Sequence, residues 1–330
     1  MCTAITYKTR DFYFGRTLDY EHSFGEEVTF LPRNFPLPFR HGKTLQSPLA
    51  ILGMALVSEE YPLYFDGFNE KGLCMAGLNF VGFAHYEKPV EGKDNIAQFE
   101  LIPWILGQCA TVAQAKKLLQ NLNITDTAFS PALPPAQLHW IIADREESIT
   151  VEAVREGLRV YQNPVGVLTN NPEFDDQLFN LRNYMHLSPK PPENRFSPGL
   201  DLKPYSRGMG AMGLPGDLSS PSRFVRAVFV KGNSVSGEGE AESVGQFFHI
   251  LGAVEQVRGC CLTENGQYEY TQYTSCCNAT RGIYYYTTYE DRQIVGVEMF
   301  GEDLEGSRLR RYGAVGAMMF PLRGNDAASP

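Results

Sequence analysis

The chain has 330 residues, of which 43% are hydrophobic and 20% are charged, and its formal net charge is −9 at pH 7. This composition allows a large core without disulfides or metals, and the acidic balance argues against a nucleic-acid partner. No apolar run approaches the roughly 20 residues of a membrane span, and no secretory signal pattern opens the chain. We therefore expect a cytoplasmic protein that has no membrane partner.

The N-terminal residues predict a β-hairpin. The segments "CTAITY" and "FYFGRTL" have the period-two pattern of strands and are separated by the polar turn "KTRD". If the numbers of facing residues sum to about 19, Cys2 lies opposite Thr17, and its neighbours are Arg16 and Leu18. Arg16 then lies beside the start of the chain through hairpin geometry alone.

Helices and further strands follow in order. Helical spacing is present in "FELIPWILGQ" and in "VAQAKKLLQNL", where Thr111 is the predicted N-cap and Gln114 occupies the capping-box position. Strand patterns are "LHWIIA", "SITVEA" and "LRVYQ", then, after a helix in "ESVGQFFHILGAVEQV", the runs "YEYTQYT", "GIYYYTTY" and "IVGVEMF". We expect one α+β domain over residues 1–330, in which helices cover mostly antiparallel sheets.

Two segments rich in proline and glycine, residues 129–137 and 186–217, predict long ordered loops. The second contains "GMGAMG", which fits the glycine pattern of dinucleotide-binding proteins. No strand precedes it, and Pro215 follows where a helix should run, so we expect no nucleotide cofactor.

The seven cysteines predict reduced thiols rather than disulfides, because their number is odd and no export signal is present. Cys260–Cys261 and Cys276–Cys277 resemble a metal-ligand quartet. Adjacent side chains on a strand point to opposite faces, which does not suit a zinc knuckle. We expect no bound metal and interpret these cysteines as small buried core residues.

Cys2 offers a chemical reason for the opening motif. Removal of Met1 leaves a terminal residue that carries both a thiol and an α-amine, whose ordinary pKa of about 7.7–8 lets it accept the thiol proton. The Arg16 guanidinium favours the thiolate, and Asp19, one residue past the predicted strand, can hold the α-ammonium. The alternative on these residues alone is a surface ion pair between Arg16 and Asp19.

Motifs along nearly the whole chain resemble those of the choloylglycine hydrolase family, a group of N-terminal-nucleophile hydrolases that includes bile salt hydrolases and penicillin V acylases. They include "MCT", "FGRTLDYEHSF", "DGFNEKGLCMAGLNF", "LHWIIAD", "GVLTNNPEFD" and "GLPGDLSSPSRFVRA", in the family order. The resemblance implies an amide hydrolase with a four-layer αββα sandwich of two mostly antiparallel sheets.

The resemblance also implies roles for single residues. Cys2 resembles the nucleophile, Arg16 the neighbour of the thiol, and Asp19 the group that holds the amine. Asn79 and Asn170 resemble the pair that stabilises the oxyanion, with Asn171 as a competitor for the second position, and Arg223 resembles a second arginine near the nucleophile. Amide N–H groups suit this task because they meet a developing negative oxygen without losing a proton.

None of the six histidines is needed in this scheme. His139 and His249 are interpreted as core or packing residues, and the others lie in polar contexts. A Cys–His dyad is the mechanistic alternative, since histidine is the commonest general base.

Asn79 stands where bile salt hydrolases carry asparagine and penicillin V acylases typically carry tyrosine, so the resemblance favours a glycine- or taurine-conjugated bile salt as substrate. The expected apolar pocket comprises Leu18, Phe65, Phe129, Leu133 and Ala136. Penicillin V hydrolysis and a catalytically silent binding protein are the alternatives. Residues 186–217 resemble the arm through which family members form homotetramers, or act only as a lid.

Overall fold

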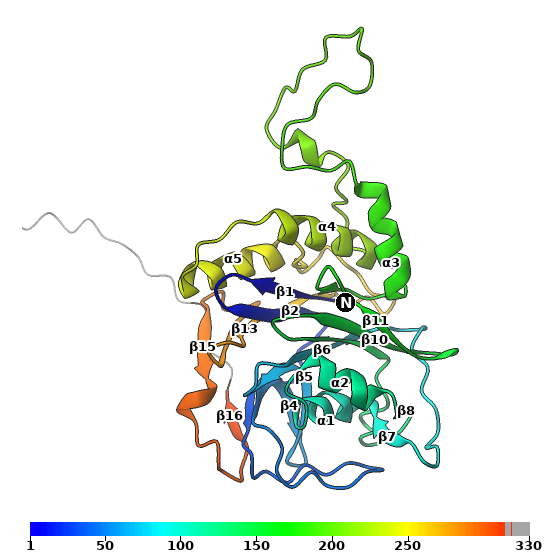
Figure 1. The fold of residues 1–330 in the computed structure, drawn as a ribbon, viewed down its shortest axis with the longest axis vertical. Coiled ribbons are helices and arrows are strands. Elements are labelled where there is room, and N and C mark those ends of the chain that lie inside the picture. The colour runs from blue at the N-terminus through cyan, green and yellow to red at the C-terminus, as the bar shows by residue number, and fades with distance from the viewer. Residues whose placement is uncertain (314–317, 319–330) are drawn as a thin grey trace, which may run out of the picture.

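Two antiparallel sheets pack face to face in the computed structural model, which describes residues 1–313 and residue 318 (Figure 1). In spatial order the six-stranded sheet consists of β12 (Val167–Leu168), β1 (Cys2–Lys8), β2 (Phe12–Tyr20), β13 (Tyr270–Asn278), β14 (Ile283–Thr288) and β15 (Val295–Glu298). The eight-stranded sheet consists of β11 (Gly157–Gln162), β10 (Ser148–Val154), β9 (Leu138–Ala143), β6 (Cys74–Asn79), β5 (Tyr61–Asn69), β4 (Ile51–Ser58), β3 (Glu27–Leu31) and β16 (Arg310–Tyr312).

Helices cover the outer faces of both sheets. α4 (Ser220–Asn233) and α5 (Glu240–Gly252) pack on β1, β2, β12 and β13, whereas α1 (Leu101–Leu106) packs on β5 and β6, with α2 (Val112–Leu119) beside it (Figure 1). The short parallel strands β7 (Asp94–Ala97) and β8 (Leu122–Thr125) flank α1 and α2. The arrangement is the expected four-layer αββα sandwich.

The buried residues form two clusters, one on each side of the eight-stranded sheet. The first joins both sheets to α4 and α5, and the second joins the eight-stranded sheet to α1 and α2. Successive residues on a strand face opposite sides, so β3, β4, β5, β6 and β9 each contribute buried residues to both clusters. For example, Cys74 and Ala76 belong to the first and Met75 to the second.

The N-terminal hairpin is present, but its predicted register is wrong by one residue. Cys2 pairs with Leu18 and Lys8 with Phe12, so the connection consists of residues 9–11. The N–H of Thr9 donates to the Asp11 carbonyl across this connection. The connection therefore has three residues, where a turn of four was predicted. Asp19, expected after the strand, lies within β2.

The predicted helices are present, with shorter ends. Gln98–Glu100 form a 3₁₀ turn before α1, and the Thr111 hydroxyl caps α2 by accepting from the N–H of Gln114 at 3.2 Å. α3 (Phe174–Asn180), α4 and the strands β3 to β6 were not predicted. His139 is fully buried as expected, but His249 is exposed because it lies on the outer face of α5.

All seven cysteines are free. Cys276 and Cys277 are buried in β13, as expected, whereas Cys260 is exposed and Cys261 is half-buried in the loop after α5, so the prediction of buried core residues is wrong for that pair. Among residues 1–313, no three His, Cys, Asp or Glu side chains gather as a metal-ligand set. No helix in the same range has the length and hydropathy to cross a bilayer.

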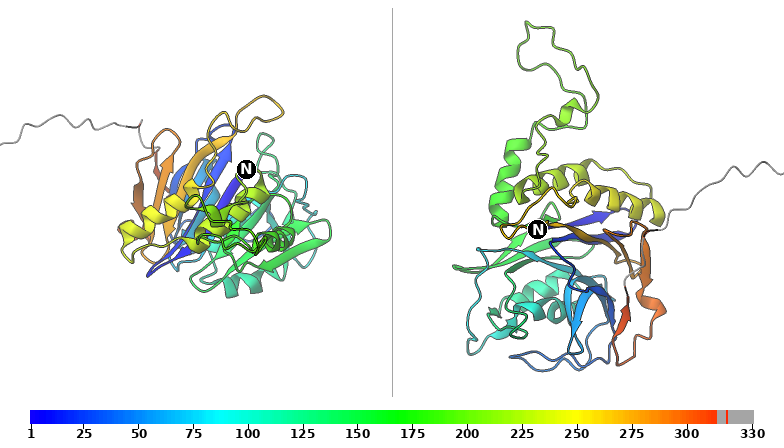
Figure 2. Two further views of the ribbon diagram at one scale, coloured as in Figure 1. Left: turned by 90° about the horizontal axis from the view of Figure 1, so that it is seen from above. Right: turned by 180° about the vertical axis from the view of Figure 1, so that it is seen from behind.

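Residues 186–217 extend away from the sandwich as an arm that follows α3 (Figures 1 and 2). Only the 3₁₀ turn Met209–Ala211, inside the "GMGAMG" motif, is regular. Large apolar side chains are exposed along the arm, including Phe196 at 87% and Tyr205 at 83%. Little of this segment packs on the rest of the molecule.

Candidate active site

Cys2 begins β1 and is almost fully buried, with 2% of its surface exposed. Its Sγ atom lies 2.5 Å from Nη2 of Arg16, on the neighbouring strand β2. Cys2 pairs with Leu18, so Arg16 is two residues from the directly opposite position and on the same face of the sheet. The observed register therefore brings the guanidinium and the sulfur together, because pairing of Cys2 with Thr17 would put the two side chains on opposite faces.

Main-chain carbonyls hold the Arg16 guanidinium in one orientation. Nε donates to the Thr17 carbonyl at 3.1 Å, and Nη1 donates to the carbonyls of Gly77 at 2.5 Å and Phe65 at 3.3 Å. Burial alone would lower the pKa of Arg16, but the negative charge available at Cys2 and at nearby acidic groups raises it. Arg16 is thus a permanent, oriented cation beside the thiol.

Asp66 on β5 supplies part of that negative charge from a fully buried position. Its carboxylate accepts from the hydroxyls of Tyr273 at 2.5 Å, Tyr284 at 2.7 Å and Ser275 at 3.2 Å. Burial raises the pKa of Asp66, and the Arg16 charge opposes this rise. Sequence patterns gave no signal for Asp66, because its hydrogen-bond partners lie more than 200 residues later in the chain.

Asp19 lies near the end of β2, next to Met1. Its carboxylate accepts from the Thr271 hydroxyl at 2.6 Å and from the Thr17 hydroxyl at 3.2 Å, and its main chain pairs with Met1. The Met1 ammonium donates to the Asp19 carbonyl at 2.6 Å and lies 2.7 Å from Glu269 Oε2. With Met1 attached, the Cys2 nitrogen is an amide and cannot act as a base.

Asn170 follows β12 and meets this nitrogen directly. Its Oδ1 accepts from the Cys2 N–H at 2.8 Å, and its Nδ2 donates to the Asn79 carbonyl at 2.8 Å. Asn79, at the end of β6, lines the cavity beside Cys2. Asn171 instead donates to the Val81 carbonyl at 2.8 Å, so of these two neighbours it is Asn170 that hydrogen-bonds Cys2.

Arg223, at the first turn of α4, contacts the main chain of Cys2 rather than its sulfur. Its Nη1 donates to the Cys2 carbonyl at 2.5 Å and to the Thr3 hydroxyl at 2.6 Å, and its Nη2 donates to Asn170 Oδ1 at 2.7 Å. Arg223 thus lies near Cys2, and its hydrogen bonds there go to the carbonyl oxygen and not to the sulfur. Burial lowers the pKa of Arg223, an effect that the charges of Asp19 and Cys2 oppose.

A cavity of about 430 Å³ opens beside Cys2 and Arg16. All five residues predicted for the pocket, Leu18, Phe65, Phe129, Leu133 and Ala136, line it. Sequence reasoning missed further members from β2, the loop after it, β4, β5 and the segment before α1, namely Tyr20, Phe24, Leu56, Leu63, Tyr64 and Phe99. The result is a mostly apolar chamber with a thiol, a cation and the Asn79 amide in its wall.

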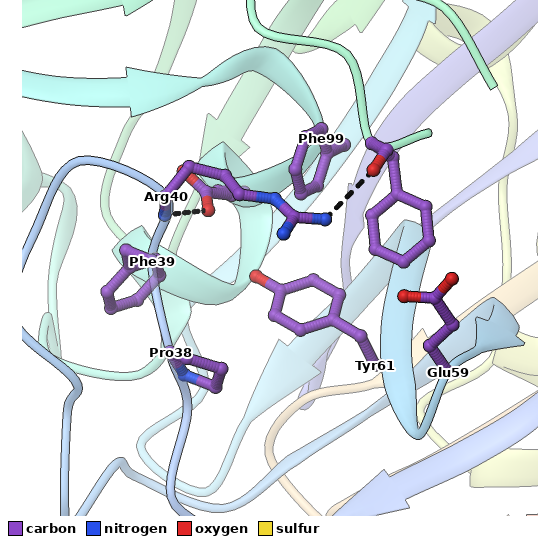
Figure 3. Close-up of a pocket in the computed structure, with 8 residues that line it drawn as sticks. Pro38, Phe39, Arg40, Glu59, Tyr61 and Phe99 are labelled. Carbon is purple, nitrogen blue, oxygen red and sulfur yellow. Dashed lines mark hydrogen bonds between the residues drawn. The ribbon is translucent and has the colours of Figure 1, made fainter. Parts of the chain in front are cut away.

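Phe99 and Phe129 also line a second cavity of about 340 Å³, together with Tyr61 and Arg40 (Figure 3). Arg40 Nη2 donates to the Phe129 carbonyl at 2.9 Å, and the Arg40 N–H donates to Glu100 at 2.6 Å. The guanidinium carbon also lies 5.2 Å from the centre of the Phe129 ring, within range of a cation–π interaction. Arg40 thereby fixes the proline-rich loop that forms one wall of the Cys2 cavity.

Residues 2–312 match the family of linear amide C–N hydrolases, choloylglycine hydrolase family. The chain is similar to a bile salt hydrolase/transferase of Lactiplantibacillus plantarum, with 56% identity over 94% of this chain and 96% of that protein. It is similar to a bile salt hydrolase/transferase of Clostridium perfringens, with 40% identity over 94% of this chain and 96% of that protein.

Solved structures agree with this result. A mutant of the conjugated bile acid hydrolase of Clostridium perfringens matches with a TM-score of 0.91 and 37% identity, over 98% of this chain and 100% of that chain. Penicillin V acylase of Agrobacterium tumefaciens matches with a TM-score of 0.77 and 21% identity, over 96% and 92% of the two chains, which shows likeness of fold alone. The chain belongs to the choloylglycine hydrolase family of linear amide C–N hydrolases and has the N-terminal-nucleophile hydrolase fold.

Proposed function

We propose that this protein hydrolyses the amide bond of glycine- or taurine-conjugated bile salts, with Cys2 as its nucleophile. The observation that carries the proposal is the contact of the Cys2 sulfur with Arg16 in the wall of a largely apolar cavity of about 430 Å³. Such a cavity suits the apolar body of a steroid. The relatives named bile salt hydrolase/transferase support this choice of substrate.

The mechanism requires removal of Met1, which converts the Cys2 amide into an α-amine. The amine takes the thiol proton, the sulfur attacks the amide carbonyl, and the ammonium returns the proton to the departing nitrogen of glycine or taurine. A thioester remains, and water activated by the same amine releases the bile acid. The position of Asn170 Oδ1, 2.8 Å from the Cys2 nitrogen, supports a role in orienting that amine.

Negative charge develops on the carbonyl oxygen during both attacks. Asn79 lines the cavity beside Cys2, and one hydrogen of the Asn170 amide is not used by the Asn79 carbonyl, so we assign these two side chains as donors to the oxyanion. We assign Asp19, whose main chain lies beside the terminus, to hold the α-ammonium that removal of Met1 exposes. Arg223 fixes the Cys2 carbonyl and Asn170 relative to each other.

Parallel turnover tests the substrate class. Protein that lacks Met1 is incubated with a glycine conjugate, a taurine conjugate and penicillin V, and the released amine is measured. We expect faster hydrolysis of a bile salt than of penicillin V, and none in Cys2→Ala, whose buried side chain loses only the sulfur. Preferential cleavage of penicillin V, or turnover by Cys2→Ala, contradicts the proposal.

Intact-mass measurement of the active protein tests the base. We expect the mass to be lower by one methionine residue, because an acylated nitrogen cannot accept the thiol proton. Retained Met1 in fully active protein would rule out the α-amine as base. Retained Met1 together with bile salt binding and no turnover would identify a silent binding protein on the same fold.

We also propose that the enzyme is a cytoplasmic homotetramer. The free cysteines agree with a reducing compartment. Exposed apolar side chains on the arm of residues 186–217 support assembly through that segment.

A further inference from the structure

His139 is fully buried on β9, and both of its ring nitrogens have a partner. Nδ1 lies 2.9 Å from Oε1 of Glu152 on β10, and Nε2 lies 3.0 Å from the Thr169 carbonyl oxygen. The ring stacks on Phe80 with a centroid separation of 4.3 Å and an interplanar angle of 7°. Two hydrogen bonds and one stacking contact therefore fix the orientation of this ring, whereas packing alone would need no hydrogen-bonding side chain here.

Proton counting fixes the hydrogen-bond pattern. A carbonyl oxygen only accepts, so Nε2 carries a hydrogen that it donates to Thr169. The contact between Nδ1 and Glu152 needs one more hydrogen, either on the ring or on the carboxyl group. In both cases the pair shares one proton and has no net charge, which allows it to be fully buried. The N–H of Phe174 also donates to Glu152, at 3.2 Å.

Two of the three partners of His139 are direct chain neighbours of the two asparagines at the site. Thr169 precedes Asn170 in the chain, and Phe80 follows Asn79. His139 itself pairs with Leu78 in the sheet, and Leu138 pairs with Asn79. His139 therefore contacts both segments that the hydrogen bond from Asn170 Nδ2 to the Asn79 carbonyl joins, through its ring at Phe80 and Thr169 and through its main chain at Leu78.

We propose that His139 is a positioning residue that holds the segments of Asn79 and Asn170 in register for oxyanion stabilisation. This inference rests on the proposed amide hydrolysis. His139 does not touch the substrate in this role, and its two nitrogens are already occupied, so it does not serve as the base in a Cys–His dyad.

Two substitutions separate the hydrogen bonds from the shape of the ring. His139→Phe keeps a flat ring against Phe80 and removes both hydrogen bonds, and we expect kcat to fall at least tenfold while KM changes less than about twofold. Glu152→Gln keeps the geometry with a neutral amide that donates to Nδ1 and accepts from Phe174, so we expect kcat within about threefold of the unsubstituted enzyme.

Alkylation of Cys2 by iodoacetamide provides a second measurement, because that reaction forms no oxyanion. We expect the alkylation rate of His139→Phe to equal that of the unsubstituted enzyme although its amide hydrolysis is slow. Leu119→Ala, a buried substitution on α2 outside the Cys2 cavity, controls for general loss of stability and should keep its kcat.

Three results would overturn the inference: an unchanged kcat in folded His139→Phe, an equal loss of hydrolysis and alkylation, or a Glu152→Gln variant as slow as His139→Phe. Failure of the proposed function is seen separately, because the unsubstituted enzyme would then not hydrolyse the conjugates at all.

Discussion

The Asn170 side chain links three parts of the proposed site, namely Cys2, Arg223 and the end of β6 at Asn79. Its carboxamide oxygen accepts from both Cys2 and Arg223, and its nitrogen donates to Asn79. Loss of this amide removes a proposed oxyanion donor and leaves the buried Arg223 without one of its partners. Single residues at this centre therefore affect chemistry and local order together.

Asn170→Ala and Asn171→Ala form a matched pair of adjacent substitutions. We expect Asn170→Ala to lower kcat by about 10²- to 10³-fold, the usual cost of losing an oxyanion donor. Asn171→Ala should stay within about threefold, because that side chain donates its hydrogen bond to the Val81 carbonyl and not to a group of the proposed site. Steady-state hydrolysis of one conjugate measures both. A larger loss in Asn171→Ala would exchange the roles of the two residues.

Among the elements, α4 joins the proposed site to the six-stranded sheet through its two ends. Arg223 in its first turn holds Cys2 and Asn170, and Lys231 in its last turn donates to Val165 at 2.5 Å and to the Thr6 hydroxyl at 3.0 Å. Both cations donate hydrogen bonds to oxygen atoms of the protein instead of to water. The helix is therefore fixed against β1 by polar contacts as well as by its apolar face.

Lys231 gives this contact a pH dependence. Burial lowers the pKa of Lys231 to about 8, from 10.5 for an exposed lysine. Between these pH values the unfolded chain binds more protons than the folded protein, so the free energy of unfolding rises with pH. Measured relative to Lys231→Met by urea denaturation, the unsubstituted protein should gain about 1–2 kcal/mol from pH 8 to pH 10. Parallel pH curves for the two proteins would contradict this expectation.

For the complete chain, the arrangement of the cores predicts one cooperative unit. Trp104 and Trp140 lie in the second cluster, so tryptophan fluorescence reports on the unfolding of that cluster. Far-UV circular dichroism instead reports on the helices and strands of the whole molecule. The two clusters share the eight-stranded sheet, so we expect fluorescence and far-UV circular dichroism to give the same urea midpoint. Two separate midpoints would indicate that residues 1–330 do not unfold as one domain.

Assembly is the second prediction for the complete chain. Phe196 and Tyr205 on the arm are more than four-fifths exposed, which favours burial against another copy. We expect sedimentation as a tetramer, and dissociation to smaller species in the double variant Phe196→Ser and Tyr205→Ser. Val235→Ser, at an 86% exposed apolar residue outside the arm, should leave the tetramer intact. A monomeric unsubstituted protein would assign the arm another role, such as a lid.

Local patterns predicted a large part of this molecule. Period-two segments identified the hairpin and the strands β9 to β11 and β13 to β15, and the Thr111 hydroxyl identified the start of α2, because alternation and capping depend on neighbours in the chain. Helix α4 was missed, since "SPSRF" reads as a polar loop when its burial against β1 is unknown. Strands β3 to β6 were missed as well.

The amino-acid order alone predicts a hairpin that puts Arg16 on the strand next to Cys2. The observed register, in which Cys2 pairs with Leu18, is what places the two side chains on one face, because a shift of one residue would put them on opposite faces. Family motifs pointed to Asn79, Asn170 and Arg223, but their contacts depend on β1, β6, β12 and α4 packing at one place. The contacts of Asp66 with its hydroxyl partners, and those of His139 with Glu152 and Thr169, likewise depend on how distant strands pack. These groups are far apart in sequence, and only the closure of the two sheets brings them within hydrogen-bond distance.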